Sequence, residues 1–390
     1  MNEFDIYINR RGSDCKKYKD CDEDGMAFWI ADTDFKVPDF VSNAIIERAN
    51  HELYGYPYIK KDFKIVTKQW LERRHNLHIE ESQILYAMGV IPALIYAIDE
   101  FTNPGDKIII NTPIYPPIVK AIENNGRIVS STSFIENDSS YYINFDEMKM
   151  LASDSKAKML ILVNPHNPIG KVYSKDELIQ ISNIARDNEL LVFSDEIHSD
   201  IILSDKKHIP FISIDDYAKM NTITGYNPGK AFNVSGLRTA SVIICNEDIK
   251  RRFINSMYRK KGEGITIFGQ EGYIACYKHG DDYIDQLNLY LKKNLLYIKN
   301  YVNTNMPKLK ISNPEGTYLL WMDFSEYFSK HEELMQFLDR LKIQLNDGTT
   351  FGEEGNLHAR FNFAVPRKVI EEGMERLSDG LNSIWCIQRN

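Results

Sequence analysis

Short apolar runs alternate with longer segments of helical periodicity between about residue 84 and residue 245. The runs are apolar throughout rather than at every second position, which is typical of strands buried on both faces of a parallel sheet. Strands that alternate with helices in this way predict an α/β fold around a mostly parallel sheet. The candidate strands are 107–111, 127–130, 158–163, 190–194, 221–224 and 240–245, and a further apolar run lies at 84–88.

Helical patterns connect these runs and dominate the end of the chain. The segment 174–188 opens on a Ser-Lys-Asp-Glu capping box, which predicts a helix start. A long amphipathic helix is predicted over 281–302, and a final helix over 368–384. The polar stretch 136–140 is interpreted as a plain surface loop.

The change of pattern divides the chain into two unequal domains. A large domain is expected over 49–283 and a smaller α+β domain over 284–390, joined by the N-terminal segment 1–48. The length of 390 residues fits this division, since domains contain about 100–200 residues.

Composition and charge narrow the classes of function. Apolar residues make up 43% of the chain and charged residues 26%, which excludes disordered, collagen-like and coiled-coil proteins. The 47 Lys and Arg residues against 55 Asp and Glu residues give a formal charge of −8. This balance argues against a broad surface for nucleic acid or anionic lipid.

The cysteines and the apolar windows indicate a cytoplasmic protein. Five cysteines are spread over the chain without a C-x-x-C pair, as expected for free thiols in a reducing compartment. The first residues are acidic and no apolar run follows them, so we expect no signal peptide. No window approaches the ~20 apolar residues that a membrane span requires.

Polar residues gather at the ends of the predicted strands, where open α/β sheets carry their active sites. The runs that follow the strands are Gly89–Pro92, Asn164–Gly170, Asp195–Asp200 and Gly225–Lys230. Two familiar interpretations of these runs fail. A nucleotide P-loop needs four residues between its glycines and a Ser or Thr after the lysine, whereas Gly225 and Gly229 are separated by three and Ala231 follows Lys230.

A metal site is the second interpretation that fails. Its ligands would come from Asp195, Glu196, His198 and Asp200. Alternation along the chain sends Asp195 and Glu196 to opposite sides, and no partner motif of the H-E-x-x-H kind is present. We therefore expect no metal.

The strand-end residues together suit pyridoxal phosphate. The amine of Lys230 would form a Schiff base with the cofactor, and Asp195 would pair with its pyridine nitrogen. The phosphate would lie at the helix N-terminus opened by Gly89, Val90 and Ile91, where free N–H groups and the helix dipole favour an anion. The guanidinium of Arg238 would add a bidentate, charged contact to that phosphate.

At this point the sequence resembles a known family. Four runs look like the class I/II aminotransferase superfamily of fold-type I, which depends on pyridoxal phosphate: Asn164–Gly170, Ser194–His198, Lys230–Arg238 and Arg360–Phe363. Four more resemble the MalY/PatB branch of cystathionine β-lyases: Phe28–Phe35, Tyr54–Pro57, Pro113–Pro117 and Gly316–Asp323. The resemblance extends from about residue 10 to residue 380, and the order of the motifs along the chain makes it specific.

The resemblance implies roles for further residues. Asn167 would hydrogen-bond the ring hydroxyl of the cofactor, and Tyr115 would stack on its pyridine face. Arg360 would bind the α-carboxylate of the substrate through a two-point fork. Tyr56 would reach the phosphate from the neighbouring subunit, which implies a homodimer. His198 stays open between a position near the ring hydroxyl and a buried, satisfied histidine.

The chain departs from the branch at three positions. Gly229 and Ala231 stand where the branch usually has Ser and Thr around the lysine, so a hydroxyl contact near the phosphate or the lysine amine is missing. Asn227 or the backbone of Gly229 is a possible substitute. Thr33 replaces the usual Met of the Ala-Asp-Met-Asp-Phe run, which puts the entrance contacts in doubt.

The expected reaction is C–S β-elimination on cysteine, cystathionine or a cysteine conjugate, with pyruvate, ammonia and a thiol as products. The amine of Lys230 would remove the Cα proton; free lysine titrates near ~10.4, so this requires a dry pocket beside cationic groups. An aminotransferase that shares every cofactor contact is the alternative. An alternative of another class is a ligand-sensing or regulatory protein on the same fold.

Overall fold

In a computed structural model of the chain, residues 3–388 are described, with side chains through residue 384. The α-helices are α1 Asp39–Ala49, α2 Lys61–His75, α3 Val90–Phe101, α4 Pro116–Glu123, α5 Phe145–Ala152, α6 Lys175–Asp187, α7 Asp216–Met220, α8 Glu247–Arg259, α9 Ile267–His279, α10 Asp281–Asn305, α11 His331–Arg340 and α12 Arg367–Gln388. The strands are β1 Met26–Ala27, β2 Ile84–Ala87, β3 Lys107–Thr112, β4 Ile128–Ser133, β5 Ile135–Asn137, β6 Ser140–Tyr142, β7 Ala157–Val163, β8 Leu191–Asp195, β9 Thr222–Tyr226, β10 Ala240–Ile243, β11 Lys310–Ile311, β12 Leu319–Asp323, β13 Ile343–Gln344, β14 Asn346–Asp347 and β15 His358–Asn362.

A central sheet organises the larger part of the molecule. Within the described residues it has seven strands in the order β2-β10-β9-β8-β7-β3-β4. Pairing is parallel from β9 across to β4, and β10 runs antiparallel to both of its neighbours. The carboxyl ends of β2, β7, β8 and β9 therefore meet at one edge of the sheet.

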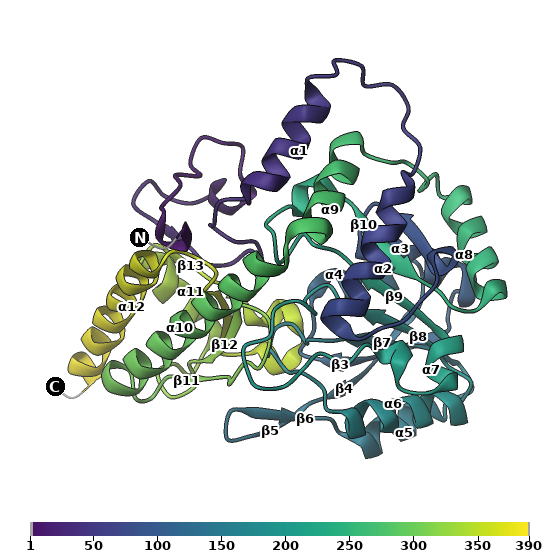
Figure 1. The fold of residues 1–390 in the computed structure, drawn as a ribbon. Coiled ribbons are helices and arrows are strands. Elements are labelled where there is room, and N and C mark those ends of the chain that lie inside the picture. Colours follow the sequence, from purple (N-terminus) through teal and green to yellow (C-terminus); the bar gives the residue numbers. More distant parts are fainter. Residues whose placement is uncertain (1–2, 389–390) are drawn as a thin grey trace.

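Helices cover both faces of this sheet because its strands are apolar on both sides. Ile108 and Ile110 of β3 pack into a core with α3, α4 and α8, whereas Ile109 packs into another core with α5, α6 and α7. Successive residues of a strand point to opposite faces, so the continuous apolar run fills two cores at once. Figure 1 shows this layered part beside the helices α10 and α12.

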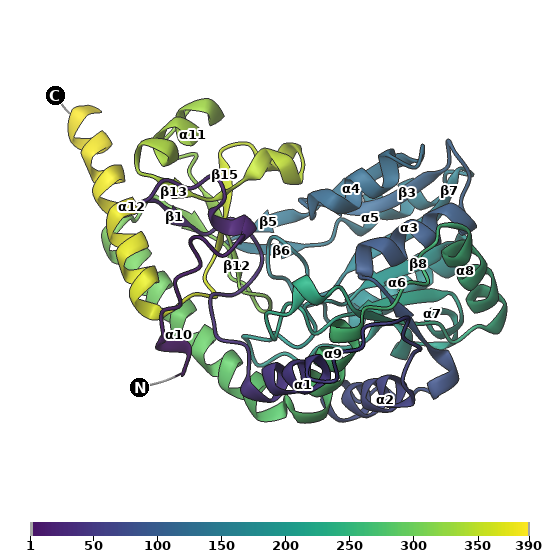
Figure 2. The same cartoon turned by 90° about the horizontal axis from the view of Figure 1, so that it is seen from above.

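The end of the chain forms a second, smaller sheet with strand order β11-β12-β15-β14. Figure 2 separates the two parts: this sheet lies with α10, α11 and α12 on one side and the central sheet on the other. The N-terminal segment joins the smaller part, since Met26 and Ala27 of β1 pair with Ile343 and Gln344 of β13. The division into domains at residues 48 and 283 stays a prediction.

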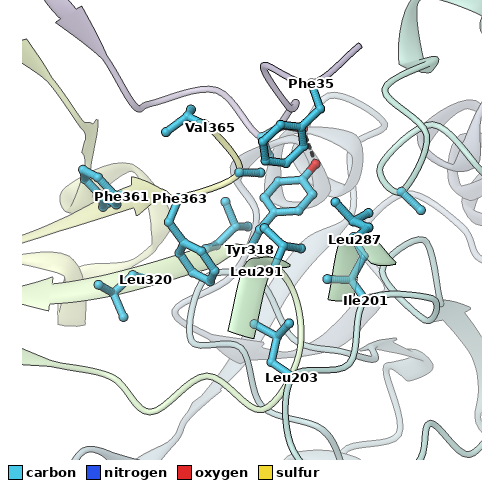
Figure 3. Close-up of a cluster of buried hydrophobic side chains, with 14 of the residues drawn as sticks. Phe35, Ile201, Leu203, Leu287, Leu291, Tyr318, Leu320, Phe361, Phe363 and Val365 are labelled. Atoms are coloured by element: carbon cyan, nitrogen blue, oxygen red, sulfur yellow. Dashed lines mark hydrogen bonds between the residues drawn. The ribbon is translucent and has the colours of Figure 1, made fainter. Parts of the chain in front are cut away.

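A buried cluster ties the smaller sheet to the N-terminal segment and to the central part. Figure 3 shows Tyr318 among Phe35, Ile201, Leu291 and Phe363, which come from segments far apart in the sequence. The Tyr318 hydroxyl donates a hydrogen bond to the carbonyl of Ala31 (3.1 Å). This cluster fixes the backbone of residues 29–35 next to the edge of the central sheet.

The fold class expected from the sequence is confirmed, including the capping box at Ser174. Two details were wrong. The stretch 136–140 is not a plain loop but the turn of the hairpin β5–β6, in which Asp138 and Ser139 take the positive φ angles of a tight turn. The apolar run of β10 was expected in a parallel strand but belongs to an antiparallel one. An unbroken apolar run indicates that a strand is buried on both faces and does not indicate its direction.

Two further findings concern the expected compartment. None of the helices in the described part of the chain is long and apolar enough to cross a membrane. The four cysteines whose side chains are described, Cys15, Cys21, Cys245 and Cys276, are free thiols, and Cys386 lies outside the described side chains.

Candidate active site

Residues at or after the carboxyl ends of β2, β3, β7, β8 and β9 meet in one cavity of about 320 Å³ at the carboxyl edge of the central sheet. Its lining consists of Met88, Gly89, Val90, Ile91, Pro92, Tyr115, Val163, Asn167, Asp195, Ile197, His198, Asn227, Lys230, Ser235 and Arg238. All the residues that the sequence assigned to the cofactor are included except Tyr56. Because parallel strands deliver their carboxyl ends to the same edge, residues from widely separated parts of the chain converge here.

Lys230 lies in the turn that follows β9, where its amine is withdrawn from water. Nζ donates a hydrogen bond to the carbonyl of Ala31 (2.7 Å) and has no ion-pair partner within 4 Å in the described chain. Burial lowers the pKa of this amine to about 8, with a further lowering from Arg360, against smaller opposing effects of Asp32 and Asp195. The amine is therefore much closer to neutrality at pH 7 than a lysine on the surface.

Asp195 is the last residue of β8, and its side chain is 6% exposed. One carboxylate oxygen accepts a hydrogen bond from the backbone N–H of Ile197 (3.2 Å). Burial raises the pKa of this carboxyl to about 6, while Ile197 N–H and Lys230 oppose the shift. A cation placed beside it inside the cavity, such as a protonated pyridine nitrogen, would stabilise the carboxylate form and lower this pKa.

Glu196, the next residue, belongs to a different buried network. Its carboxylate accepts hydrogen bonds from His208 (2.7 Å), Tyr226 and the backbone N–H of Phe211 (3.0 Å). Neighbouring positions therefore face different surroundings, as alternation predicted. No cluster of three metal-ligating side chains occurs among the described residues.

Arg360, on β15, is 1% exposed and forms no ion pair with any carboxylate in residues 3–384. NH1 donates to Asn167 Oδ1 (2.9 Å) and NH2 donates to the carbonyl of Trp29 (2.7 Å), while Nε has no partner. Burial lowers the pKa of the guanidinium to about 10, since no anion compensates the charge. A buried cation with an idle donor is costly, and an incoming carboxylate would relieve it.

The opposite end of the cavity suits a phosphate. Gly89 precedes α3 with φ of +142°, a conformation that residues with a Cβ rarely adopt, and the N–H groups of Val90 and Ile91 have no acceptor in the described chain. Ala93 is the first residue of α3 whose N–H bonds back into the chain, to the carbonyl of Gly89 (3.2 Å). The guanidinium of Arg238 lines the same end and forms no ion pair with the described carboxylates. Free N–H groups, a helix N-terminus and an unpaired cation together favour a dianion.

His198 and Tyr115 complete the wall between the two ends. The ring of His198 lies 6.0 Å from that of Tyr318, and its Nδ1 is buried without a partner in the described residues. Burial, with Lys230 and Arg360 next in importance, holds the pKa of His198 well below its usual value, so the ring is neutral. An unsatisfied imidazole nitrogen in the cavity wall favours the position beside a ligand over that of a satisfied buried histidine.

Tyr56 stands apart from the other predicted residues. Its side chain is fully exposed, at 107% of the reference area, and it does not line the cavity of its own chain. Residues 52–60 around it form neither helix nor strand. A contribution of Tyr56 to a cofactor site therefore requires a second subunit.

Several residues of the site had not been singled out from the sequence. Ser235 lines the cavity next to Arg238, and Asn227, considered only as a substitute donor, lines it as well. Asn362 donates to the carbonyls of Ile30 (2.7 Å) and Asp32 (2.5 Å) and so holds the segment that covers Lys230. Asn362 and Ser235 lie inside motifs that the sequence displayed, but their contacts depend on long-range packing.

These residues fit pyridoxal phosphate at each functional group. The cavity offers a cationic pocket with free N–H groups, an amine with a lowered pKa, and a buried carboxylate that a neighbouring cation would stabilise. Nδ1 of His198 and Nε of Arg360, both without a partner in the described residues, are additional groups that a bound ligand would satisfy.

Comparisons with known proteins agree with this geometry. The family model of class I and II aminotransferases matches residues 24–377. The cystathionine β-lyase PatB of Bacillus subtilis (strain 168) is 32% identical over 97% of this chain and 100% of its own length.

Two solved structures cover nearly the whole chain. Cystalysin from Treponema denticola, which contains a pyridoxal 5'-phosphate cofactor, superposes with a TM-score of 0.95 at 33% identity, over 98% of this chain and 100% of that one. A protein of Clostridium difficile 630 assigned provisionally as an aminotransferase, also with pyridoxal phosphate bound, gives 0.94 at 34% identity over 98% and 100%.

Proposed function

Since the chain belongs to the class I and II aminotransferase family, in the branch of MalY- and PatB-like C–S lyases, we propose that it cleaves the C–S bond of cystathionine or a related cysteine derivative. The enzyme depends on pyridoxal phosphate, as its solved relatives do. One observation carries the assignment of an amino-acid substrate. The site combines an amine with a lowered pKa, that of Lys230, with the guanidinium of Arg360, which has no ion-pair partner in the described residues.

When bound, the cofactor would supply an electron sink for the substrate Cα, and the amine of Lys230 would hold it in the cavity. Asp195 sustains this withdrawal by keeping a positive charge on the pyridine nitrogen. Val90, Ile91 and Arg238 anchor the phosphate, and Tyr115 with Asn167 fixes the plane of the ring.

Arg360 orients the substrate. Its guanidinium binds the α-carboxylate, and because Asn167 already holds NH1, the fork has a fixed direction before the substrate arrives. An α-carboxylate is the one anion that every amino acid shares, so this contact selects the class of substrate rather than its side chain.

Lys230 then moves the proton. Once its amine is released, Nζ takes the Cα proton, which the pKa of about 8 permits near neutral pH. The bond from Cβ to sulfur breaks, its electron pair leaves with the sulfur, and the sulfur acquires a proton to become the thiol. With one water molecule, cystathionine yields homocysteine, pyruvate and ammonia.

The test is incubation of the cofactor-loaded enzyme with cystathionine in the absence of any keto acid, with pyruvate followed by a coupled dehydrogenase. The proposal predicts many turnovers per active site, and none for the variant K230A. An aminotransferase would instead stop after one equivalent, with the cofactor in its amine form, and resume only with added keto acid. That alternative is kept because the C. difficile relative is assigned to aminotransferases.

The active unit is proposed to be a homodimer in the cytoplasm. Large apolar side chains are exposed around Tyr56, including Leu53 (69%), Tyr54 (55%) and Tyr58 (79%). A patch of this kind on one face favours contact with a second copy of the chain, which would bring Tyr56 to the phosphate end of the neighbouring cavity. The free cysteines suit a reducing compartment.

A further inference from the structure

Gly229 and Ser235 share one small volume at the phosphate end of the cavity. Lys230 lies between them in sequence, and the chain folds back so that the N–H of Val234 donates to the carbonyl of Gly229 (3.2 Å). A Cβ built on Gly229 would lie 2.8 Å from Ser235 Oγ and 2.7 Å from Asn227 Oδ1. Real Cβ atoms essentially never approach so closely, so the hydroxyl of Ser235 occupies the space into which a side chain at position 229 would project.

The resemblance described above leads us to expect serine at position 229, where this chain has glycine. Its replacement by glycine removes one hydroxyl from the site, and Ser235 brings another into the same volume. Ser235 Oγ forms no hydrogen bond within the described chain, so its hydroxyl is free to donate to a ligand. Asn227, whose Oδ1 accepts from the N–H of Gly229 (2.5 Å), brings an amide donor rather than a hydroxyl to this end of the cavity.

The surroundings of Ser235 point to an anion rather than to the lysine amine. Ser235 lines the cavity together with Arg238, whose guanidinium has no carboxylate partner in residues 3–384, and with the free N–H groups at the start of α3. The amine of Lys230 is directed elsewhere, to the carbonyl of Ala31.

We propose that Ser235 supplies the hydroxyl donor to the cofactor phosphate, and that Gly229 is the compensating exchange that makes room for it. The proposal deepens the proposed function, on which it rests: it requires that the cavity binds pyridoxal phosphate. Ser235 is then a cofactor-binding residue, and the pair Gly229 and Ser235 relocates one phosphate contact along the chain.

The experiment measures the affinity of the cofactor-free protein for two ligands, pyridoxal phosphate and pyridoxal, which lacks the phosphate. Absorbance and tryptophan fluorescence report binding without any assay of activity. A hydrogen bond to a charged group accounts for about 10- to 100-fold in affinity, so S235A should raise the Kd for pyridoxal phosphate by that factor. The Kd for pyridoxal should stay within about twofold, as should both constants for the control S325A, an exposed serine after β12.

A swap of the two side chains gives a second measurement. G229S should also weaken pyridoxal phosphate, because the new Cβ meets Ser235 Oγ. The double variant G229S/S235A removes the contact with Ser235 Oγ and returns a hydroxyl to the same volume. Because Asn227 Oδ1 still lies 2.7 Å from the new Cβ, part of the lost affinity should return. Retained binding of pyridoxal by each single variant shows that it folds.

Two results overturn the proposal. Unchanged affinity of S235A for pyridoxal phosphate excludes a phosphate contact, and equal losses for pyridoxal and pyridoxal phosphate place the hydroxyl at the lysine or the ring. If the parent protein itself binds no pyridoxal phosphate, the proposed function fails instead, so the two failures are distinguishable.

Discussion

Individual residues in and beside the cavity are held in surroundings that cost stability in the cofactor-free protein. Arg360 is a buried cation without an ion-pair partner in residues 3–384, burial makes the charged form of Asp195 less favourable, and His198 Nδ1 has no partner in the same residues. Each of these groups would be satisfied by one part of the ligands: the substrate carboxylate, the pyridine nitrogen and the ring substituents. At the residue scale, the site is therefore arranged to bind its ligands, and this arrangement lowers the free energy of unfolding of the ligand-free protein.

Arg360 provides a prediction for substrate binding. R360K keeps a positive charge but loses the two-point fork, so kcat/KM for cystathionine should fall about 10- to 100-fold. The Kd for pyridoxal phosphate should change much less, since Arg360 reaches the cofactor only through Asn167. Steady-state kinetics with R340K, an exposed arginine on α11, as the control would check this. Parent-like kinetics of R360K would contradict the assigned role.

Asp195 provides a prediction for pH. Its carboxyl has a pKa of about 6 in the folded protein against 3.8 in the unfolded chain, so the folded state binds the proton more tightly. The associated stability is complete below pH ~4 and is lost as the pH rises through about 6. Relative to D195N, the cofactor-free parent should therefore lose roughly 2–3 kcal/mol in free energy of unfolding between pH 4 and 7.

Urea denaturation of the two cofactor-free proteins across this range would measure that difference. A difference between parent and D195N that does not change with pH would show that Asp195 is not held in a protonated state.

At the scale of elements, the decisive arrangement is the segment 29–35 between the smaller sheet and the turn that carries Lys230. Three side chains hold its backbone: Arg360 bonds to Trp29, Tyr318 to Ala31, and Asn362 to Ile30 and Asp32. The same segment accepts the hydrogen bond of Lys230 Nζ. Motion of the smaller sheet would therefore be transmitted directly to the lysine.

Removal of Asn362 tests this arrangement. N362A leaves the carbonyls of Ile30 and Asp32 and the N–H of Ala364 without their partner in a buried position, and should cost about 2–4 kcal/mol in free energy of unfolding. Urea denaturation of the cofactor-free protein measures the loss. N356A, which truncates an exposed asparagine of the same region, should change stability by less than about 0.5 kcal/mol. Similar values for the two variants would contradict the proposed anchoring.

The helices and strands, and the residues that follow them, differ in how far the sequence could predict them. The strands and the polar residues that follow them depend on local patterns, and these patterns suffice to predict that Asp195, Asn167 and Lys230 share one edge of the sheet. The contacts of Asn362 and the exchange of Gly229 with Ser235 depend on how distant segments pack, which no local pattern reports. The hairpin 135–142 was missed because its turn residues, Asp138 and Ser139, resemble an ordinary polar loop.

At the scale of the whole molecule, the proposed dimer would make each site depend on two chains. The fully exposed Tyr56 and the apolar patch around it predict that the chain of 45.2 kDa associates in pairs. If a site is shared between subunits, two different inactive variants can regain activity when their chains form mixed dimers. A site built from a single chain does not allow this.

Mixed dimers of Y56A and K230A provide this test. One of their two cavities combines an intact Lys230 with an intact Tyr56 from the partner. Random exchange between equal amounts of the two variants should therefore return about a quarter of the parent activity. Differently tagged chains confirm that mixed dimers have formed. If such dimers stay as inactive as the parental variants, Tyr56 does not act across the interface.

The central claim is that Lys230 holds pyridoxal phosphate in this cavity. Borohydride reduction of the yellow, cofactor-loaded protein followed by peptide mass spectrometry tests the claim most directly. The account predicts the mass of the reduced cofactor on the peptide that contains Lys230, and a colourless K230A variant without any labelled peptide. A label on another lysine, or none on the parent protein, would contradict it.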